Sequence, residues 1–204
     1  MAHDLDVFLN CPFDSQYEEL FWAIIFTIHE CGFVARCALE VDDSSDVRIH
    51  KIYRIIRESQ FGIHDISRTE PDPTSGLPRF NMPLELGLFL GAKEFGSRPQ
   101  KRKKCLVMDR EQYRFQHYCS DIAGQDIKEH GGDRVRAIRV VRDWLRQWVL
   151  EPRVTVPGGD AISARYDAFL TAFPLMCQEA RVELRELSYV DRQRMTVGWL
   201  KEHP

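Results

Sequence analysis

The sequence predicts an α/β fold in which helices cover both faces of a central parallel sheet, a three-layer sandwich. Short apolar segments typical of strands alternate with longer segments of helical periodicity, in the order strand, helix, strand, helix, strand, loop, helix, strand. This alternation implies parallel strands joined by right-handed crossovers. The 204 residues, 44% of them apolar, suffice for one α/β domain with a small appendage.

The first predicted strand and helix lie close to the N-terminus. Residues 5–10 alternate and then become apolar, which is typical of a strand, and residues 17–28 carry apolar side chains at helical spacing. We expect Asp14 or Ser15 to cap this helix at its start, because short polar side chains accept hydrogen bonds from free backbone N–H groups. Gly32 is expected to end it in the left-handed conformation that glycine allows.

The second and third strands flank another helix. Residues 33–38 form the second strand, residues 40–46 an acidic loop, and residues 61–66 the third strand. Ser45 or Asp46 is expected to cap the helix between them. The predicted buried face of this helix carries Ile49, Ile52, Ile55 and Ile56, and its predicted solvent face carries His50, Lys51, Arg54 and Arg57.

A carboxylate within an apolar helix is the most informative feature of the sequence. Residues 81–92 read as a helix that is apolar on nearly every side, and such a helix is buried. Glu85 is the polar exception in it, and burying a carboxylate is costly unless it is paired, protonated or facing a cavity. It could cap its own helix or pair with Arg79. We favour a catalytic or ligand-holding acid at the mouth of the sheet.

Two glycines and a further strand follow. Gly87 and Gly91 lie one turn apart. Each costs about 1 kcal/mol of stability relative to alanine in a helix interior, which suggests that the helix approaches the sheet or a ligand closely there. Tight packing is at least part of the explanation.

Residues 67–80, before the helix, form a long loop without periodicity, and such loops are often functional. Residues 104–109 form the fourth strand.

The second half of the chain reads as mainly helical. Residues 113–132 are polar with few strand signals, and residues 135–149 form an amphipathic helix whose arginines are expected to face solvent. Prolines and glycines from Pro152 onward mark a linker. A helix from about Ala161 is expected to be interrupted at Pro174, and residues 188–204 to form a short helix. The arginines on the amphipathic helix are Arg136, Arg139, Arg142 and Arg146.

We therefore expect an α/β domain over residues 1–150 and a helical extension over residues 151–204, packed on that domain or on a partner. Trp144, Trp148 and Trp199 are candidate interface residues, although core packing is the favoured use of the first two.

Composition excludes several classes of function. The net charge of −3 gives no general attraction to nucleic acid or to anionic membranes. No apolar run approaches the roughly 20 residues that a membrane span needs, and the N-terminus does not resemble a signal peptide. The six cysteines lack metal-binding spacing, so we expect reduced core thiols, a cytoplasmic protein and no metal.

Three segments are predicted to meet where ligands bind in such sheets, beyond the carboxyl ends of the strands. They are residues 10–14, residues 65–68 and the start of the Glu85 helix. Asp65 suits a ribose hydroxyl or the orientation of a base, and equally it could cap the loop that it begins. Asp14 is more readily a helix cap than a ligand, although the helix N-terminus beside it suits a phosphate. The chain lacks the glycine-rich phosphate-binding motifs and the serine-hydrolase elbow.

These residues resemble the TIR-like superfamily and the related nucleoside 2-deoxyribosyltransferase-like proteins. The segment Asp-Val-Phe-Leu-Asn-Cys-Pro-Phe-Asp at residues 6–14 is similar to the first-strand signature of bacterial TIR-like proteins. Asp65, followed by Asn-Met-Pro-Leu-Glu-Leu-Gly at residues 81–87, is similar to their aspartate and N-x-x-x-E-L-G pattern. The resemblance covers about the first half of the chain. It implies a flavodoxin-like sandwich and places Glu85 at the position of the catalytic glutamate.

The resemblance further implies cleavage of the base–ribose bond of NAD or a related nucleotide. Glu85 would be the catalytic acid, which stabilises developing positive charge or attacks the anomeric carbon. NAD would be a substrate, with no cofactor, and residues 40–46 would gate the site. Substrate would be held by Asn10, Pro12, Phe13, Asp14, Asp65, Ser67 and Asn81.

Such domains often act in bacteria as antiphage defence effectors or as producers of nucleotide signals, and many need a homo-oligomer or a partner sensor protein. Two alternatives stay open. One is a nucleoside 2-deoxyribosyltransferase-like hydrolase of (deoxy)nucleosides or nucleotides. The other is a non-catalytic nucleotide-binding adaptor, in which Glu85 serves binding or folding alone.

Overall fold

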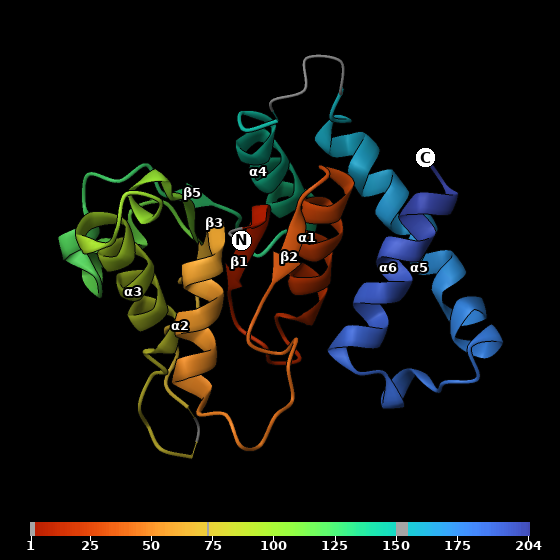
Figure 1. Ribbon diagram of the computed structural model, residues 1–204, viewed down its shortest axis with the longest axis horizontal. Helices are drawn as coiled ribbons and strands as arrows, with labels where there is room; N and C mark the ends of the chain where they lie inside the picture. The colour runs from red at the N-terminus through yellow and green to blue at the C-terminus, as the bar shows by residue number, and fades with distance from the viewer. Residues whose placement is uncertain (1–2, 73, 150–154) are drawn as a thin grey trace.

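The computed structural model describes residues 3–72, 74–149 and 155–204. Its centre is a five-stranded, all-parallel sheet with the strand order β2-β1-β3-β4-β5 (Figure 1). The α/β class with a central parallel sheet is therefore confirmed. The strands are β1 (His3–Asn10), β2 (Val34–Arg36), β3 (Ser59–Asp65), β4 (Lys104–Asp109) and β5 (Lys128–Glu129). The helices are α1 (Glu18–Glu30), α2 (Arg48–Glu58), α3 (Asn81–Phe95), α4 (Arg134–Arg146), α5 (Gly159–Glu179) and α6 (Tyr189–Glu202).

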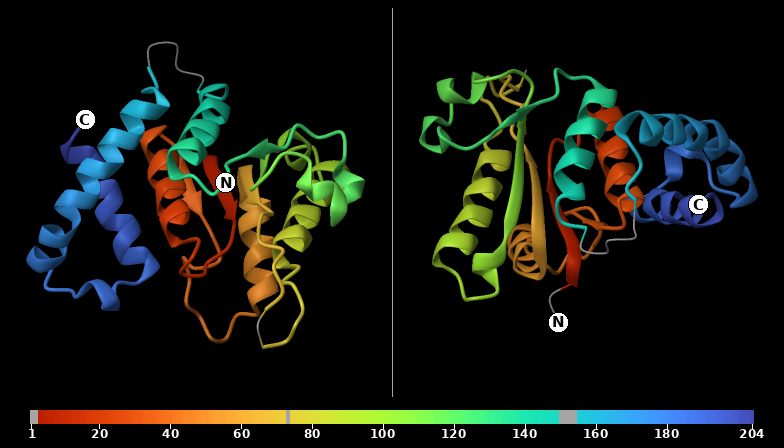
Figure 2. Two further views of the ribbon diagram at one scale, coloured as in Figure 1. Left: turned by 180° about the vertical axis from the view of Figure 1, so that it is seen from behind. Right: turned by 90° about the horizontal axis from the view of Figure 1, so that it is seen from above.

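Helices cover both faces of the sheet, as Figure 2 shows from above. Successive side chains of a strand point to opposite faces. Val7 and Leu9 of β1 accordingly belong to the apolar cluster under α1 and α4, whereas Phe8 belongs to the cluster under α2 and α3. Leu106 and Val107 of β4 divide in the same way. The sandwich thus has two separate apolar interfaces.

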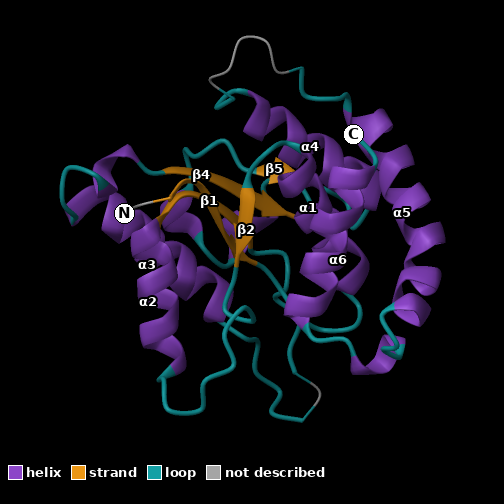
Figure 3. Ribbon diagram, turned by 45° about the vertical axis from the view of Figure 1, so that its right-hand side comes forward, coloured by secondary structure: helices purple, strands orange, loops and turns teal. Residues whose placement is uncertain are grey.

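The C-terminal helices pack on the outer side of the α1–α4 layer (Figure 3). The ring of Phe26 in α1 lies 5.2 Å from that of Tyr166 and 5.6 Å from that of Phe169, both in α5. Trp199 of α6 lies 6.0 Å from Phe26 and is buried. The helices α5 and α6 therefore pack on α1 and α4 of the same chain. The expected domain boundary at residues 150–151 and Pro152 lie outside the described residues.

The two tryptophans near the end of α4 are half-buried. Trp144 and Trp148 lie 6.0 Å and 6.2 Å from Phe61 of β3, measured between ring centroids. The inner sides of both rings therefore pack in the core, which is the use that the sequence favoured for them. None of the described helices combines the length and apolar character that crossing a bilayer requires.

The predicted caps of the first two helices are wrong. Tyr17 precedes α1 and Val47 precedes α2, and neither helix has a side-chain cap. Asp14 instead accepts a hydrogen bond from the backbone of Gln16 at 3.1 Å, and Asp46 pairs with Arg54 at 3.0 Å. Short polar side chains bind local backbone in turns as readily as at helix ends, so the pattern marks both structures. Gly32 does end the first helical segment with φ of +83°.

The surroundings of α3 also correct the sequence prediction. One face is buried, and it carries Met82, Glu85, Leu86 and Phe89. Leu84 and Gly87 are exposed, so the helix is not enclosed on nearly every side. A Cβ added at Gly87 or Gly91 would meet no atom within 4 Å. The close approach occurs at Gly62 of β3, where an added Cβ would lie 2.8 Å from the ring of Phe89.

Several other expectations fail because charged and irregular residues make contacts that periodicity does not reveal. Lys51 is buried, and its ammonium donates to the carbonyl of Val41. Arg142 of α4 is largely buried as well and donates to the carbonyl of Pro157 at 2.6 Å. The helix α5 continues through Pro174 without interruption. The two-residue strand β5 lies within the polar stretch that carried few strand signals.

Candidate active site

A polar cavity of about 270 Å³ lies at the carboxyl end of β1, beside the first turn of α3. Carboxylates, arginines and amides line it together with a few apolar side chains. Six of the eight site residues predicted from the sequence are among its walls. These six are Asn10, Pro12, Phe13, Asp14, Asn81 and Glu85.

Asn10 fixes the start of α3 against the end of β1. It is the last residue of β1 and is buried, and its Nδ2 donates to the carbonyl oxygen of Met82 at 2.8 Å. The same nitrogen lies 3.0 Å from Nδ1 of His64 in β3. Burial, aided by the nearby Lys103 ammonium, lowers the pKa of His64 to about 3, so its ring is neutral and Nδ1 can accept this hydrogen bond. The hydrogen bond from Asn10 to Met82 therefore holds the first turn of α3, and with it Glu85, at the cavity.

Glu85 is a nearly buried carboxyl group without a partner among the described residues. Its exposed fraction is 8%, and no described side chain or backbone group forms a hydrogen bond or an ion pair with it. Burial raises the pKa of Glu85 to about 7, and the positive charge of Arg48 opposes that rise. A carboxyl group with this pKa exchanges its proton near neutral pH, as catalytic acids and bases require.

The arginine that the sequence offered as a partner for Glu85 lies elsewhere. Arg79 forms an ion pair with Asp72, with 3.4 Å between Nη2 and Oδ2. Both residues belong to the long loop before α3, so this pair stabilises the loop rather than the carboxylate. Pairing with Arg79 therefore does not explain why an acid is buried in α3.

Positive charge surrounds the cavity unevenly. Arg68 lies 3.3 Å from Asp14 and is thus partly neutralised, as Arg79 is by Asp72. Arg48, the first residue of α2, lines the cavity without an ion-pair partner among the described residues. Its guanidinium is therefore the group best placed to hold an anionic ligand such as a phosphate.

The mouth of the cavity carries an exposed aromatic ring. Phe13 has 41% of its surface exposed and contacts Phe21 of α1 edge-to-face, with 5.3 Å between ring centroids. Pro12 beside it is buried and forms part of the wall. Asn81, at the start of α3, is exposed and lies on the cavity wall next to Met82. A planar heterocycle at this mouth could stack on the free face of Phe13.

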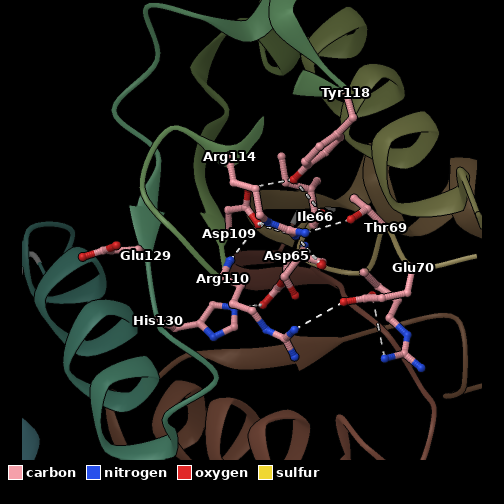
Figure 4. Close-up of polar contacts among 12 residues, drawn as sticks. Asp65, Ile66, Thr69, Glu70, Asp109, Arg110, Arg114, Tyr118, Glu129 and His130 are labelled. Carbon is pink, nitrogen blue, oxygen red and sulfur yellow. Dashed lines mark hydrogen bonds and ion pairs between the residues drawn. The ribbon is translucent and has the colours of Figure 1, made fainter. Parts of the chain in front are cut away.

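The structure does not bring the predicted residues Asp65 and Ser67 into the cavity wall. Asp65 is fully buried at the end of β3, where Tyr17 donates to it and the backbone of Ser67 donates at 2.8 Å. His130, which lies beside Asp65 in Figure 4, places its Nε2 3.0 Å from the carboxylate. Burial acts to raise the pKa of Asp65, but the contacts with His130, Ser67 and Tyr17 outweigh it and lower the pKa. Its place fits the alternative reading, an aspartate that caps the loop it begins.

A second buried carboxylate supports the loop that forms the cavity wall. Asp109, at the end of β4, accepts hydrogen bonds from Arg114 at 2.7 Å and from Tyr118 at 2.8 Å. Arg114 also donates to Thr69 at 2.8 Å and to the carbonyl of Ser67, as Figure 4 shows. Residues 67–69 are thereby tied to the sheet, which fixes the approach to the cavity.

Sequence reasoning predicted Glu85 and Asp14 as site residues but assigned no ligand role to the other charged residues of the cavity wall, although Arg68 lies in the predicted segment 65–68. Arg68, Glu70, Asp72 and Arg79 all lie in the loop of residues 67–80, and its length was the signal that marked it as functional. Arg48 carried no such signal, because its role depends on how α2 begins relative to β1. The loop of residues 40–46, expected as a gate, lies outside the cavity wall.

Comparisons of the chain with protein-family models, with curated proteins and with solved structures found no match.

Proposed function

We propose that this protein is an N-glycosidase that cleaves the bond between base and ribose in NAD or a related nucleotide, with Glu85 as the catalytic residue. One observation carries the proposal. A carboxyl group with a pKa near 7, for which the described part of the chain offers no partner, faces a cavity at the carboxyl end of a parallel sheet, where ligands of such folds bind. The resemblance of residues 6–14 and 81–87 to TIR-like sequences supports the same assignment.

Cleavage of the base–ribose bond requires one negative charge beside the anomeric carbon of the ribose. As the C–N bond breaks, nicotinamide leaves with the bonding electron pair, which neutralises its ring charge, and the ribose becomes oxocarbenium-like. Ionised Glu85 would stabilise that cation, or bond to the anomeric carbon as a nucleophile. Water then adds to the anomeric carbon and loses a proton, which gives ADP-ribose. Because nicotinamide leaves as a neutral molecule, no acid is needed to protonate it.

The cavity wall offers groups for the rest of the substrate. Arg48 would hold a phosphate, because its guanidinium has no ion-pair partner among the described residues. Phe13 would stack on the leaving base at the mouth, and Asn81 and Asp14 would meet sugar hydroxyls. Asn10 acts through its bond to Met82 and is a positioning residue for Glu85.

The size of the cavity favours one alternative substrate. A volume of about 270 Å³ is at the small end for ligand sites, and it suits a single nucleoside unit better than a whole dinucleotide. A (deoxy)nucleotide hydrolase of the nucleoside 2-deoxyribosyltransferase-like kind is therefore the second candidate. In that reaction the leaving base needs a proton, and Glu85 with a pKa near 7 could supply it in its protonated form.

A chromatographic assay of base release separates these possibilities. The purified protein would be incubated with NAD, NADP, deoxynucleosides and deoxynucleoside 5′-phosphates. We expect nicotinamide from NAD or NADP. Release of base from the deoxy compounds alone would support the second candidate instead. No release from any substrate, with thermal stabilisation by one of them, would identify a binding protein and overturn both enzymatic assignments.

A further inference from the structure

The sheet is open along the first part of β4. The strand β5 pairs only with the last two residues of β4, so residues 104–107 have no strand neighbour on that side in the described part of the chain. The amide of Ile66 donates to the carbonyl of Met108 at 3.0 Å, so the backbone of Met108 faces β3. Backbone groups alternate along a strand, and those of Cys105 and Val107 therefore face the open edge. An edge of this kind is a template for another strand.

A groove of about 770 Å³ runs beside this edge. Both helical layers contribute to its walls, which places it between them where the sheet ends. Its length along residues 104–107 is about 13 Å at the rise of a strand, so four extended residues span it. Apolar side chains alternate with polar ones in the walls, with Leu90 from α3 on one side and Val140 and Trp144 from α4, followed by Trp148 just beyond the end of that helix, on the other.

The groove carries two lysines without ion-pair partners among the described residues. Lys93 lies in the last turn of α3, and Lys104 is the first residue of β4, so both flank the amino end of the open edge. The ammonium of Lys104 lies 4.9 Å from the ring centroid of Trp148, a cation–π contact that leaves its charge uncompensated.

The acids of the groove are already neutralised by other cations. Asp126 lies 2.6 Å from the ammonium of Lys128, and Asp143 lies 2.8 Å from the guanidinium of Arg142. The charge that remains for a ligand is therefore positive. An occupant with carboxylates beside Lys93 and Lys104 would complete the site.

We propose that this groove binds an extended acidic peptide of a partner protein, which adds a strand to the open edge of β4. Its backbone would pair with Cys105 and Val107, and its side chains would alternate between the α3 wall and the α4 wall. Asp or Glu would lie beside Lys93 and Lys104, and β-branched or other apolar side chains would contact the apolar part of the walls at Leu90, Val140 and Trp144. This inference is independent of the activity at Glu85.

Peptide selection against the full chain tests the proposal. Random heptapeptides displayed on phage would be selected on the wild-type protein and counter-selected on the Lys93→Glu/Lys104→Glu double variant. We expect enrichment of peptides that combine acidic with β-branched residues. Synthetic copies should bind the double variant at least tenfold more weakly by fluorescence anisotropy. Arg194→Glu/Lys201→Glu, with the same charge change on the exposed side of α6, should bind as the wild type does.

Two further measurements separate strand addition from a general charge effect. Peptide copies with N-methyl groups on alternate residues keep their side chains but cannot donate along one edge, and at least one of the two N-methylation patterns should abolish binding. Binding should also slow amide hydrogen exchange at Cys105 and Val107. Selection of peptides without acids, equal binding to the double variant, or binding by both N-methylated forms would overturn the proposal. A wild-type dimer that the double variant loses would assign the groove to a second copy of this chain.

Discussion

At the level of single residues, the carboxyl group of Glu85 lies where folding alone would not place it. It is held near the cavity by Asn10 and Met82, has little exposed surface, and lacks a partner among the described residues. Its raised pKa means that the ionised form is disfavoured by the fold. A site that destabilises its own protein at neutral pH is more readily explained by chemistry than by packing.

The first prediction concerns stability. Between its ordinary pKa of 4.5 and the folded value of about 7, Glu85 binds more protons in the native than in the unfolded state, so wild-type stability falls as pH rises through this window. Glu85→Gln removes that dependence. We expect the variant to be more stable than the wild type by about 1–3 kcal/mol at pH 8, with a smaller gain at pH 4.5. Thermal melts at the two pH values measure this.

The control for this prediction lies on the same helix. Glu94 is exposed in α3, and Glu94→Gln makes the same chemical change without burial. Its stability should stay within about 0.5 kcal/mol of the wild type. Equal melting of both glutamine variants at pH 8 would show that Glu85 is not destabilised by its surroundings.

The second prediction concerns the pH dependence of turnover. If ionised Glu85 stabilises an oxocarbenium-like transition state, kcat/KM for NAD should rise with pH and reach a plateau above a value near 7. Steady-state rates between pH 5 and pH 9 measure this profile. A rate that falls as pH rises through 7 would indicate that the protonated form acts, as the deoxynucleotide reaction requires.

The site residues show what residue type and position in a pattern can reveal. Glu85, Asn10 and Phe13 were found from a buried-looking acid and from the ends of predicted strands, and all three line the cavity. Asp65 has the same signal, yet it faces Tyr17 and His130, because the end of a strand has two sides and the sequence does not tell which side holds the ligand. The position of Arg48 at the cavity depends on how α2 packs on the sheet, and no sequence pattern indicated it.

At the level of elements, the contact between β3 and α3 sets the position of the helix that carries Glu85. The ring of Phe89 lies over Gly62, so the absence of a side chain in the strand lets the helix pack closely against the sheet. The sequence pointed instead to Gly87 and Gly91, because glycine in a helix is unusual and glycine in a strand drew no attention. Both helix glycines face open space.

The third prediction compares these glycines. Gly62→Ala would place a Cβ within 2.8 Å of Phe89 and 2.7 Å of His64 Nε2, so we expect a loss of about 1–3 kcal/mol from overpacking. Gly87→Ala adds a methyl group into free space in an exposed helical position and should stabilise by about 0.5–1 kcal/mol. Urea unfolding of both variants measures the two free energies. A stabilising Gly62→Ala would show that α3 does not press on β3.

At the level of the whole molecule, the order of elements from β1 to β4 was predictable because each of these four strands contains an apolar run and the segments between them have helical periodicity or apolar character. The strand β4 matches its predicted bounds at residues 104–109. What failed was local: the two-residue β5 is too short to carry periodicity, Asp14 binds the backbone of a turn in the way a helix cap would, and Asp46 pairs with Arg54 instead of capping α2. The packing of α5 and α6 on α1 required tertiary contacts that no pattern encodes.

The fourth prediction concerns acid stability. Burial lowers the pKa of His64 to about 3 and that of His29 to about 4, so both are neutral when folded and protonate more readily when unfolded. Stability should therefore fall as pH drops below 6.5, by up to about 1.4 kcal/mol per pH unit for each ring. His29→Gln should reduce the slope of stability against pH between 6.5 and 4. His117→Gln, on the exposed surface, should leave the slope unchanged. Equal slopes in wild type and His29→Gln would contradict this account.

The most direct test of the central claim is a paired measurement of nicotinamide release from NAD and of NAD binding, for the wild type and Glu85→Gln at pH 8. We expect release by the wild type and a decrease of at least about 10³-fold in kcat for the variant, because a charge that stabilises the transition state is lost. NAD binding by calorimetry should change less than tenfold. Equal turnover by both proteins, or NAD binding without turnover by the wild type, would contradict the assignment of Glu85 as the catalytic residue.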